Sequence, residues 1–292
     1  MDAAQAVIES GVSVNASDEQ GQTLLQWSIV FDETNLAQYL IENGADVNAI
    51  QLNGWSAVHV AAQKNNADVV KALLQYGADV DTRDGVGESP LQVAALYGSD
   101  DVAKVLIENG ADINAEDITK QTPFYIAVKM LNTNVSKLLV EAGADVNANF
   151  PIFWIAANNL VDVFNLVIEK GIQINPRTEN KDVPLHTAAM NGKTEMGRLL
   201  IQNGAEVNAK NNQGETPIFK AAYTGSGEFV RMLIESGADI NARNNNGKTP
   251  LQIADQMNIT GTAKEVLNEY GAEEGVPDTL EEQWCKRFVC DL

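Results

Sequence analysis

Two histidines and two cysteines are the side chains of this 292-residue chain best suited to metal binding or nucleophilic chemistry. Cys285 and Cys290 stand near the C-terminus with no histidine beside them, and on a helix their spacing of five places them on different faces. His59 and His186 lie far apart and share no partner. The sequence therefore predicts no disulfide between these cysteines, no zinc site, no base–nucleophile pair and no cofactor.

A recurring aspartate is the other candidate for chemistry, because carboxylates bind calcium and act as acids or bases. It recurs, however, only because one turn sequence recurs, and a short carboxylate in a turn accepts backbone N–H bonds. The chain has neither a phosphate-binding P-loop nor a nucleophile elbow, and its glycines are interpreted as turn and helix-stop glycines. We therefore interpret these acids as structural and predict no catalysis. They are Asp46, Asp79, Asp112, Asp145 and Asp239.

The aspartates belong to a repeated stretch, GADVNA, which first occurs from Gly44 to Ala49. From Gly44 to Gly143, and again from Gly171 to Gly237, each step is 33 residues. Self-similarity at a fixed period of this size indicates a stack of small structural repeats. The stretch returns at Gly77, Gly110, Gly143, Gly204 and Gly237, with an echo at Gly271.

A second recurring tetrapeptide has the chemistry of a helix start. It reads TLLQ at Thr23, SPLQ at Ser89 and TPIF at Thr216. A threonine or serine hydroxyl can cap the helix, and proline suits the first helical position. Apolar residues at helical spacing then follow, such as Val70 and Leu73, up to the recurring glycine. Each repeat is therefore expected to contain a turn, a short helix, a longer helix and a glycine stop.

This pattern resembles the ankyrin repeat, and its signature is closest to complete from Gly214 to Ala242. The resemblance covers about residues 2–272 and implies an all-α ankyrin repeat solenoid of about eight helix-turn-helix units with short hairpin-like turns. An N-terminal half-unit and a C-terminal capping helix complete it. The expected repeats lie near 18–50, 51–83, 84–116, 117–148, 149–177, 178–210, 211–243 and 244–272, followed by an acidic helical tail at 273–292.

The repeat at 149–177 is five residues short, and the loss falls between Asn147 and Pro151. We expect a missing turn there and a local change of curvature. At the N-terminus, residues 2–14 correspond to the second helix of a preceding repeat whose first helix is absent. Either this half-repeat is a natural cap or the chain was cut from a longer protein.

The tail has apolar residues every four positions at Leu280, Trp284 and Phe288. This spacing predicts a short amphipathic helix that covers the end of the stack, as terminal repeats require. The alternative is a tail that binds a partner.

The charge of the chain excludes some classes of partner. With 40 acids, 20 bases and a net charge of −20, the chain repels nucleic acids and anionic membranes. Its first residues have neither the basic region nor the apolar core of a signal peptide, so we expect none there, and no apolar run is long enough to span a membrane. We expect a monomeric, cytoplasmic protein whose protein partner is favoured to be basic, although nuclear location or secretion as an effector stays open.

In proteins that this chain resembles, partners contact the turn tips and the concave face of the first helices. Some of the side chains at these positions are apolar although the fold does not require an apolar residue there, which is typical of a contact surface. The apolar set, here called the strip, is Phe31, Trp55, Val86, Leu96, Tyr97, Ile118 and Met130. Together with Leu52, Lys64, Glu88, Gln121 and Lys129 it forms the predicted protein-binding surface.

Trp55 is expected to be the strongest contact, replaceable without loss of the fold. For Phe31 and Leu96, burial between repeats is an equally good interpretation. Trp27 and Trp154 are interpreted as packing residues.

Phe150, Phe153, Trp154 and Phe164 gather in the shortened repeat. Core filling is the favoured interpretation, and a second pocket is the alternative.

The resemblance carries two further implications. His59 and His186 would make structural hydrogen bonds between neighbouring repeats. Asparagines in the family's favoured context would be substrates of an asparaginyl hydroxylase where such an enzyme is present; these are Asn48, Asn114, Asn147, Asn208 and Asn241.

By analogy of fold, the sequence predicts a non-catalytic protein–protein interaction module that serves as an adaptor, scaffold or inhibitor. The alternatives are a targeting or regulatory segment of a larger enzyme or channel, and a secreted effector on the same scaffold.

Overall fold

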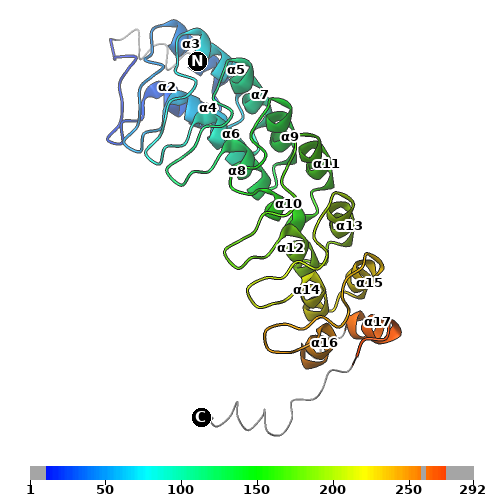
Figure 1. The fold of residues 1–292 in the computed structure, drawn as a ribbon. Coiled ribbons are helices and arrows are strands. Elements are labelled where there is room, and N and C mark those ends of the chain that lie inside the picture. Colours follow the sequence, from blue (N-terminus) through cyan, green and yellow to red (C-terminus); the bar gives the residue numbers. More distant parts are fainter. Residues whose placement is uncertain (1–10, 258–260, 274–292) are drawn as a thin grey trace. The chain divides into compact units, whose positions relative to one another are not determined.

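The computed structural model describes residues 11–257 and 261–273 (Figure 1). In this part of the chain helices follow one another in pairs, and the only extended pairings are two isolated bridges, Ser17–Thr23 and Ile50–Ser56. The all-α array of helix pairs is therefore confirmed. The pairs are α2 (Leu24–Val30) with α3 (Thr34–Glu42), α4 (Ala57–Gln63) with α5 (Ala67–Gln75), α6 (Pro90–Tyr97) with α7 (Asp100–Glu108), α8 (Pro123–Lys129) with α9 (Thr133–Glu141), α10 (Ile152–Asn158) with α11 (Val161–Glu169), α12 (Pro184–Met190) with α13 (Thr194–Gln202), α14 (Pro217–Thr224) with α15 (Gly227–Glu235), and α16 (Pro250–Met257) with α17 (Ala263–Glu269).

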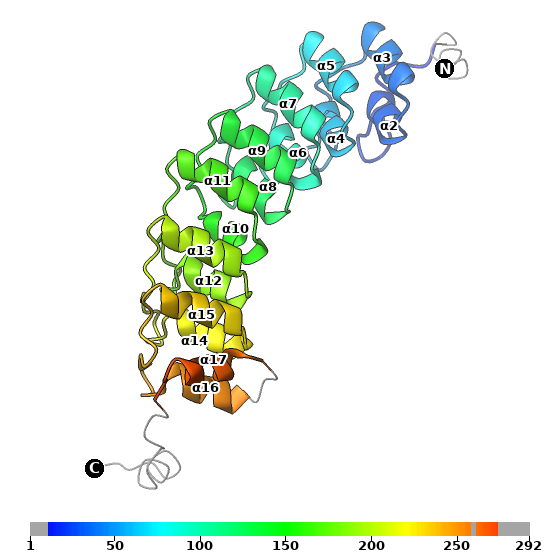
Figure 2. The same ribbon diagram turned by 90° about the vertical axis from the view of Figure 1, so that its right-hand side faces the viewer.

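The helices divide into two compact units. Unit 1 comprises Met1–Pro151 with Asp162–Ile172, and unit 2 comprises Ile152–Val161 with Gln173–Leu292. The division runs through the shortened repeat, because α10 belongs to unit 2 and nearly all of α11 to unit 1. Within unit 1, Figure 2 shows the first helices of the repeats in one row and the second helices in another.

The first helices begin as the tetrapeptides predict. Ser89 Oγ accepts a bond from the backbone N–H of Gln92 at 3.3 Å, and Gln92 Oε1 accepts one from the N–H of Ser89 at 2.8 Å. This reciprocal arrangement is a capping box, and Thr23 with Gln26 forms another. Pro90 occupies the first helical turn, where its missing N–H leaves no helical bond unmade.

The second helices end at the recurring glycines and supply the core. Gly44 has φ +85°, a left-handed conformation that ends the helix while the N–H of Ala45 donates to the carbonyl of Leu40. A completely buried leucine stands four residues before most of these stop glycines. In unit 1 these leucines are Leu40, Leu73, Leu106 and Leu139, and in unit 2 they include Leu200 and Leu233.

Between the helix pairs, short turns project as fingers. Asp84 Oδ1 holds one finger by accepting the N–H groups of Val86 and Glu88 at 2.9 and 2.8 Å. Neighbouring fingers are also joined, since the N–H of Gly85 donates to the carbonyl of Asn53 at 2.9 Å. The fingers comprise residues 18–22, 51–55, 84–88 and 117–121 in unit 1, and 178–182, 211–215 and 244–248 in unit 2.

The shortened repeat has no finger. Instead, Asn149 and Phe150 turn the chain directly toward α10, both in the left-handed region with φ of 61° and 54°. Because this region is unfavourable for a bulky side chain, Phe150 is a strained position. Its side chain is exposed. The predicted loss of the finger is therefore observed.

The tail at 274–292 lies outside the described residues, as do residues 1–10. The predictions of a capping tail helix, of the roles of Cys285 and Cys290, and of most of the N-terminal half-repeat stay predictions.

Candidate protein-binding surface

The buried histidines join neighbouring repeats. His59 Nδ1 accepts the backbone N–H of Ser56 at 3.2 Å, so the proton is on Nε2, which donates to the carbonyl of Glu88 at 3.0 Å. His186 makes the same pair of bonds to Val183 and Glu215. The structural role implied for both histidines is confirmed.

Burial lowers the pKa of both His59 and His186, although the bond to the next repeat's carbonyl opposes the shift. Both imidazoles are therefore neutral in the folded protein near neutral pH. The unfolded chain takes up protons at their ordinary pKa of 6.5, so the stability that the neutral rings supply is complete above that pH and falls as pH drops below it.

A double variant, His59→Gln with His186→Gln, tests this linkage. Glutamine occurs naturally at the same place, where Gln92 Nε2 donates to the carbonyl of Gln121 at 2.7 Å. We expect the parent to lose more stability than the variant between about pH 7 and pH 5.5 in urea unfolding, because only the parent takes up these protons. Equal losses in the two chains would show that the histidines do not carry the effect.

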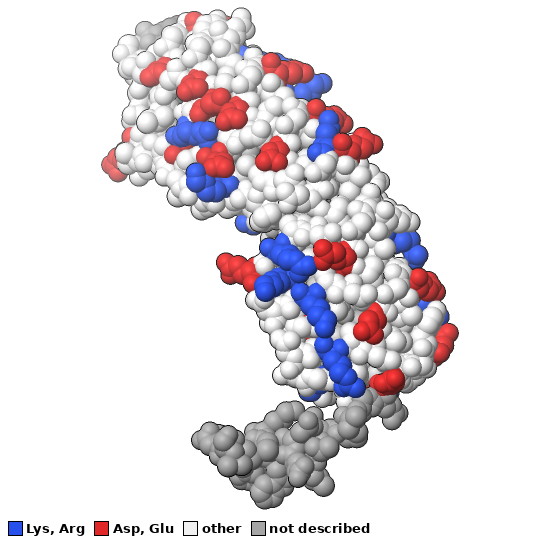
Figure 3. Space-filling model, viewed as in Figure 1, with Lys and Arg blue, Asp and Glu red and all other residues white. Residues whose placement is uncertain are grey.

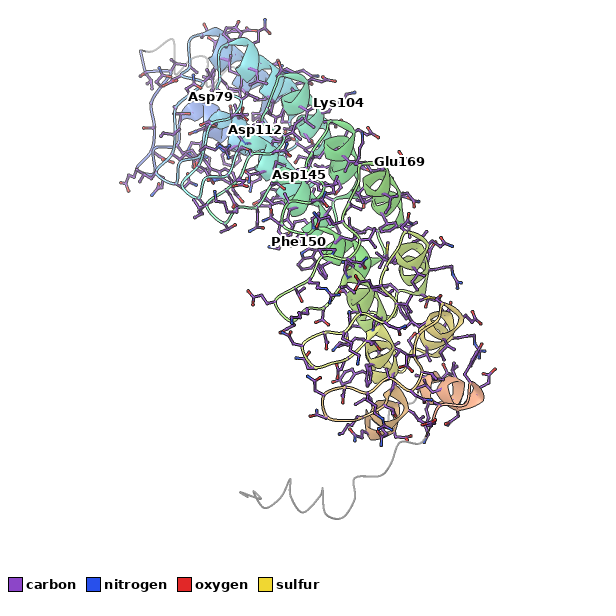
Figure 4. All side chains as sticks on the ribbon, in the orientation of Figure 1. Asp79, Lys104, Asp112, Asp145, Phe150 and Glu169 are labelled. Carbon is purple, nitrogen blue, oxygen red and sulfur yellow. The ribbon has the colours of Figure 1, made fainter. Side chains whose placement is uncertain are left out.

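The recurring aspartates hold the turns between repeats. Asp79 Oδ1 accepts the N–H of Asp81 at 3.0 Å, while the N–H of Asp79 donates to Asn48 Oδ1 at 3.0 Å. Asp112 and Asp145 make corresponding bonds, and Figure 4 shows the three aspartates following one another along unit 1. Their structural interpretation is confirmed.

The asparagines proposed for hydroxylation share this network. Asn48 Nδ2 donates to the carbonyl of Gly77 at 3.0 Å, and Asn208 Nδ2 donates to that of Gly237 at 3.0 Å. The side-chain oxygens of Asn114 and Asn241 accept N–H bonds, and Asn147 Nδ2 donates to the carbonyl of Gly171. All five amides are thus held between turns in the folded array, and their hydroxylation stays a prediction.

The described residues contain no group of three or more histidine, cysteine, aspartate or glutamate side chains placed to hold a metal ion. In the same part of the chain, none of the helices has the length and apolar character needed to cross a membrane.

Most of the strip lies on the surface of unit 1. Ile118 is 70% exposed, Phe31 69% and Tyr97 50%. Val86 and Met130 are also exposed, and Leu96 is half-buried. The apolar edge is therefore not sealed inside the stack. Leu52, at the tip of the second finger, is 82% exposed.

The sequence predicts that Trp55 contacts a partner and is replaceable without loss of the fold, but its side chain makes contacts within the array. Its indole Nε1–H donates to Asp84 Oδ2 at 3.0 Å, and its ring stacks on His59 with centroids 6.0 Å apart. The side chain is half-buried because it braces its own first helix against the next finger. Replacing Trp55 is therefore expected to weaken the array as well as any contact.

Trp27 is more exposed than a packing residue should be. Its ring stacks on Phe31 at 5.4 Å, and its Nε1–H donates to Asp18 Oδ2 at 3.0 Å. The two rings form one exposed aromatic pair at the edge of unit 1. The spacing of four residues on one helix is the signal that could have linked Trp27 with the strip.

The aromatic residues of the shortened repeat do not share one environment. Phe164 is completely buried, as core filling requires, and Phe153 is half-buried. Phe150 and Trp154 are exposed. Core filling therefore holds for Phe164 and does not hold for the exposed pair.

The polar members of the predicted surface are accessible. Lys64 is exposed, while Gln121 and Lys129 are half-buried and interact through Lys129 Nζ and Gln121 Oε1 at 3.4 Å. Glu88 is also half-buried, and its pKa is raised first by burial and then by Asp84 and Asp117. The structure places these side chains along the fingers and first helices of unit 1.

A comparison with protein-family models agrees with the stacked helix pairs seen in the structure. The model for ankyrin repeats (3 copies) matches residues 1–84, 48–117, 82–150, 152–244 and 185–278. The chain therefore belongs to the ankyrin repeat family, whose repeats are protein–protein interaction modules. No curated protein matches the chain.

Proposed function

We propose that this protein is a non-catalytic adaptor or inhibitor that binds a protein partner through the strip of unit 1. The observation that carries the proposal is the exposure of Phe31, Tyr97 and Ile118 beside the fingers. Large apolar side chains gathered on a surface favour contact with another protein, and aromatic residues dominate such contacts.

The charge around the strip indicates the kind of partner. Unit 1 carries 21 aspartates and glutamates against 8 lysines and arginines among residues 11–151 and 162–172. A partner that presents apolar side chains surrounded by lysine or arginine would be steered toward this surface. The interaction is then expected to weaken as salt increases.

A capture experiment with matched baits tests the proposal. The test bait is Phe31→Ala with Tyr97→Ala, and the control bait is Tyr76→Ala, because Tyr76 is also 50% exposed but lies at the end of a second helix. A partner retained by the parent and the control should be lost from the test bait. With the purified partner, each strip replacement should weaken binding by roughly 1–4 kcal/mol.

A stability control makes this result decisive. Both baits should unfold at the same urea concentration as the parent, since exposed substitutions usually change stability by about 0.5 kcal/mol or less. If the test bait retains the same proteins with the same affinity as the parent, the strip is not the partner site.

A further inference from the structure

Unit 2 carries a charge distribution that the net charge conceals. Residues 173–250 contain nine lysines and arginines and eight acids, although the whole chain has a net charge of −20. In Figure 3, lysine and arginine side chains form a continuous row over the region of α12, α14 and α16. This face therefore offers positive charge on an otherwise acidic protein.

Three of these basic residues occupy the same position in successive repeats. Arg177, Lys210 and Arg243 each stand directly before a finger, and all three are exposed. Arg177 pairs with Glu206 at 2.7 Å, whereas Lys210 and Arg243 have no salt bridge among the described residues. Arg243 Nη1 instead donates to the carbonyl of Gly247 at 2.8 Å, which holds its guanidinium along the finger.

A cavity opens between the first helices of unit 2. It has a volume of about 280 Å³. Its apolar walls are Met190, Phe219, Tyr223 and Ile253. Met190 and Tyr223 are exposed at its mouth, while Phe219 is buried. This volume lies near the lower limit for ligand sites and suits one large side chain rather than a drug-sized molecule.

The cavity and the positive charge are adjacent. Lys220 lines the cavity and forms a 2.7 Å ion pair with Glu215, so this lysine is already neutralised. Lys248 Nζ donates to Oε1 of Gln256, another lining residue, at 2.9 Å, which brings a second ammonium to the rim. A ligand that fills the cavity therefore meets the ammonium of Lys248 beside its apolar anchor.

We propose that this cradle, formed by the cavity with Lys210, Arg243 and Lys248, binds an acidic segment of a partner protein. One aromatic or leucine side chain of the segment fills the cavity, and its flanking carboxylates pair with the three cations. Charge complementarity selects this occupant, because a basic segment would meet Lys210 and Arg243 without compensation. The cradle is independent of the strip in unit 1, which favours the opposite charge.

The probe is a short fluorescein-labelled peptide in which one tryptophan lies between two runs of glutamate, titrated against the full chain by fluorescence anisotropy. The matched peptide has glutamine in place of every glutamate. We expect only the glutamate peptide to bind, with an affinity that falls as salt rises. Equal binding of the two peptides, or no binding of either, would overturn the proposal.

Matched protein variants localise the binding. Lys210→Glu with Arg243→Glu should weaken it at least about tenfold, whereas Lys193→Glu with Arg198→Glu, the same charge change in the same unit at α13, should weaken it about twofold or less. If the two double variants weaken binding equally, binding depends only on the overall charge of the protein, and the proposed cradle is wrong. If charge reversal impairs folding, the milder double variant Lys210→Gln with Arg243→Gln replaces it, and we expect this variant also to weaken binding more than the α13 control does.

Two further variants separate the cavity from the strip. Tyr223→Ala removes an exposed cavity wall and should weaken the glutamate peptide about fivefold or more. Phe31→Ala with Tyr97→Ala should leave its affinity unchanged, so failure of the strip proposal and failure of the cradle proposal give different results. An unchanged affinity for Tyr223→Ala would remove the cavity from the account.

Discussion

Replacement of Leu106 by alanine is expected to lower the free energy of unfolding by about 2–5 kcal/mol, as removal of a buried leucine side chain does elsewhere. Leu106 is completely buried in α7, in register with Leu73 and Leu139 of the neighbouring repeats. Since each repeat relies on its neighbours for a core, the cavity left by this change weakens two interfaces between repeats. Urea unfolding followed by circular dichroism measures the loss.

Leu52→Ala is the matched control, because it removes the same atoms from a side chain that is 82% exposed. It should change the free energy of unfolding by about 0.5 kcal/mol or less. Comparable losses for the two variants would contradict the burial that defines the core.

A second large effect is expected where glycine makes room for a phenylalanine. Gly197 lies inside α13, and a Cβ atom there would be 2.6 Å from Phe229 Cζ and 2.8 Å from Met232 Cε. Phe229 is completely buried, so its ring cannot move aside into solvent. Gly197→Val should therefore destabilise the protein by about 1–3 kcal/mol through overpacking, despite the better helix propensity of valine.

The pairing can be tested by rescue. Phe229 occupies a repeat position that holds Val69 and Val102 in unit 1. Gly197→Val combined with Phe229→Val should be more stable than the sum of the two single losses predicts, because the smaller valine at position 229 no longer meets the new side chain at position 197. Strict additivity in this double-mutant cycle would mean that the two positions are not coupled. Arg198→Ala, at an exposed neighbour, controls for general effects on α13.

Features that recur at a fixed position in several repeats could be predicted from the sequence. The helix caps, the glycine stops and the aspartate turns each depend on residues at a fixed offset, so their recurrence reveals their role. The bonds that the two histidines make between repeats were implied by the resemblance to the ankyrin repeat. The deletion before Pro151 likewise showed which finger is missing. Exposure of Ile118 followed from its position at a turn, whereas the sequence left Phe31 open between exposure and burial between repeats.

Features that depend on one pair of repeats could not be predicted. Trp55 bonds to Asp84 in the next finger, and only the stacked structure brings the two together. Gly197 was expected, like the other glycines, to serve a turn or a helix stop, yet it lies within a helix against Phe229. A net charge summed over all repeats conceals the basic row of unit 2, because the acids of the other repeats outnumber its lysines and arginines.

The most direct test of the account is amide hydrogen exchange of the full chain with and without the partner isolated by the parent bait. We expect slower exchange on binding in the fingers at 51–55, 84–88 and 117–121, and in the ends of α2, α6 and α8 that carry Phe31, Tyr97 and Met130. Exchange in α5, α7 and α9 should change little, because these second helices lie in the other row. Protection confined to the second helices, with none in the fingers of unit 1, would contradict the claim that the strip is where this protein binds its partner.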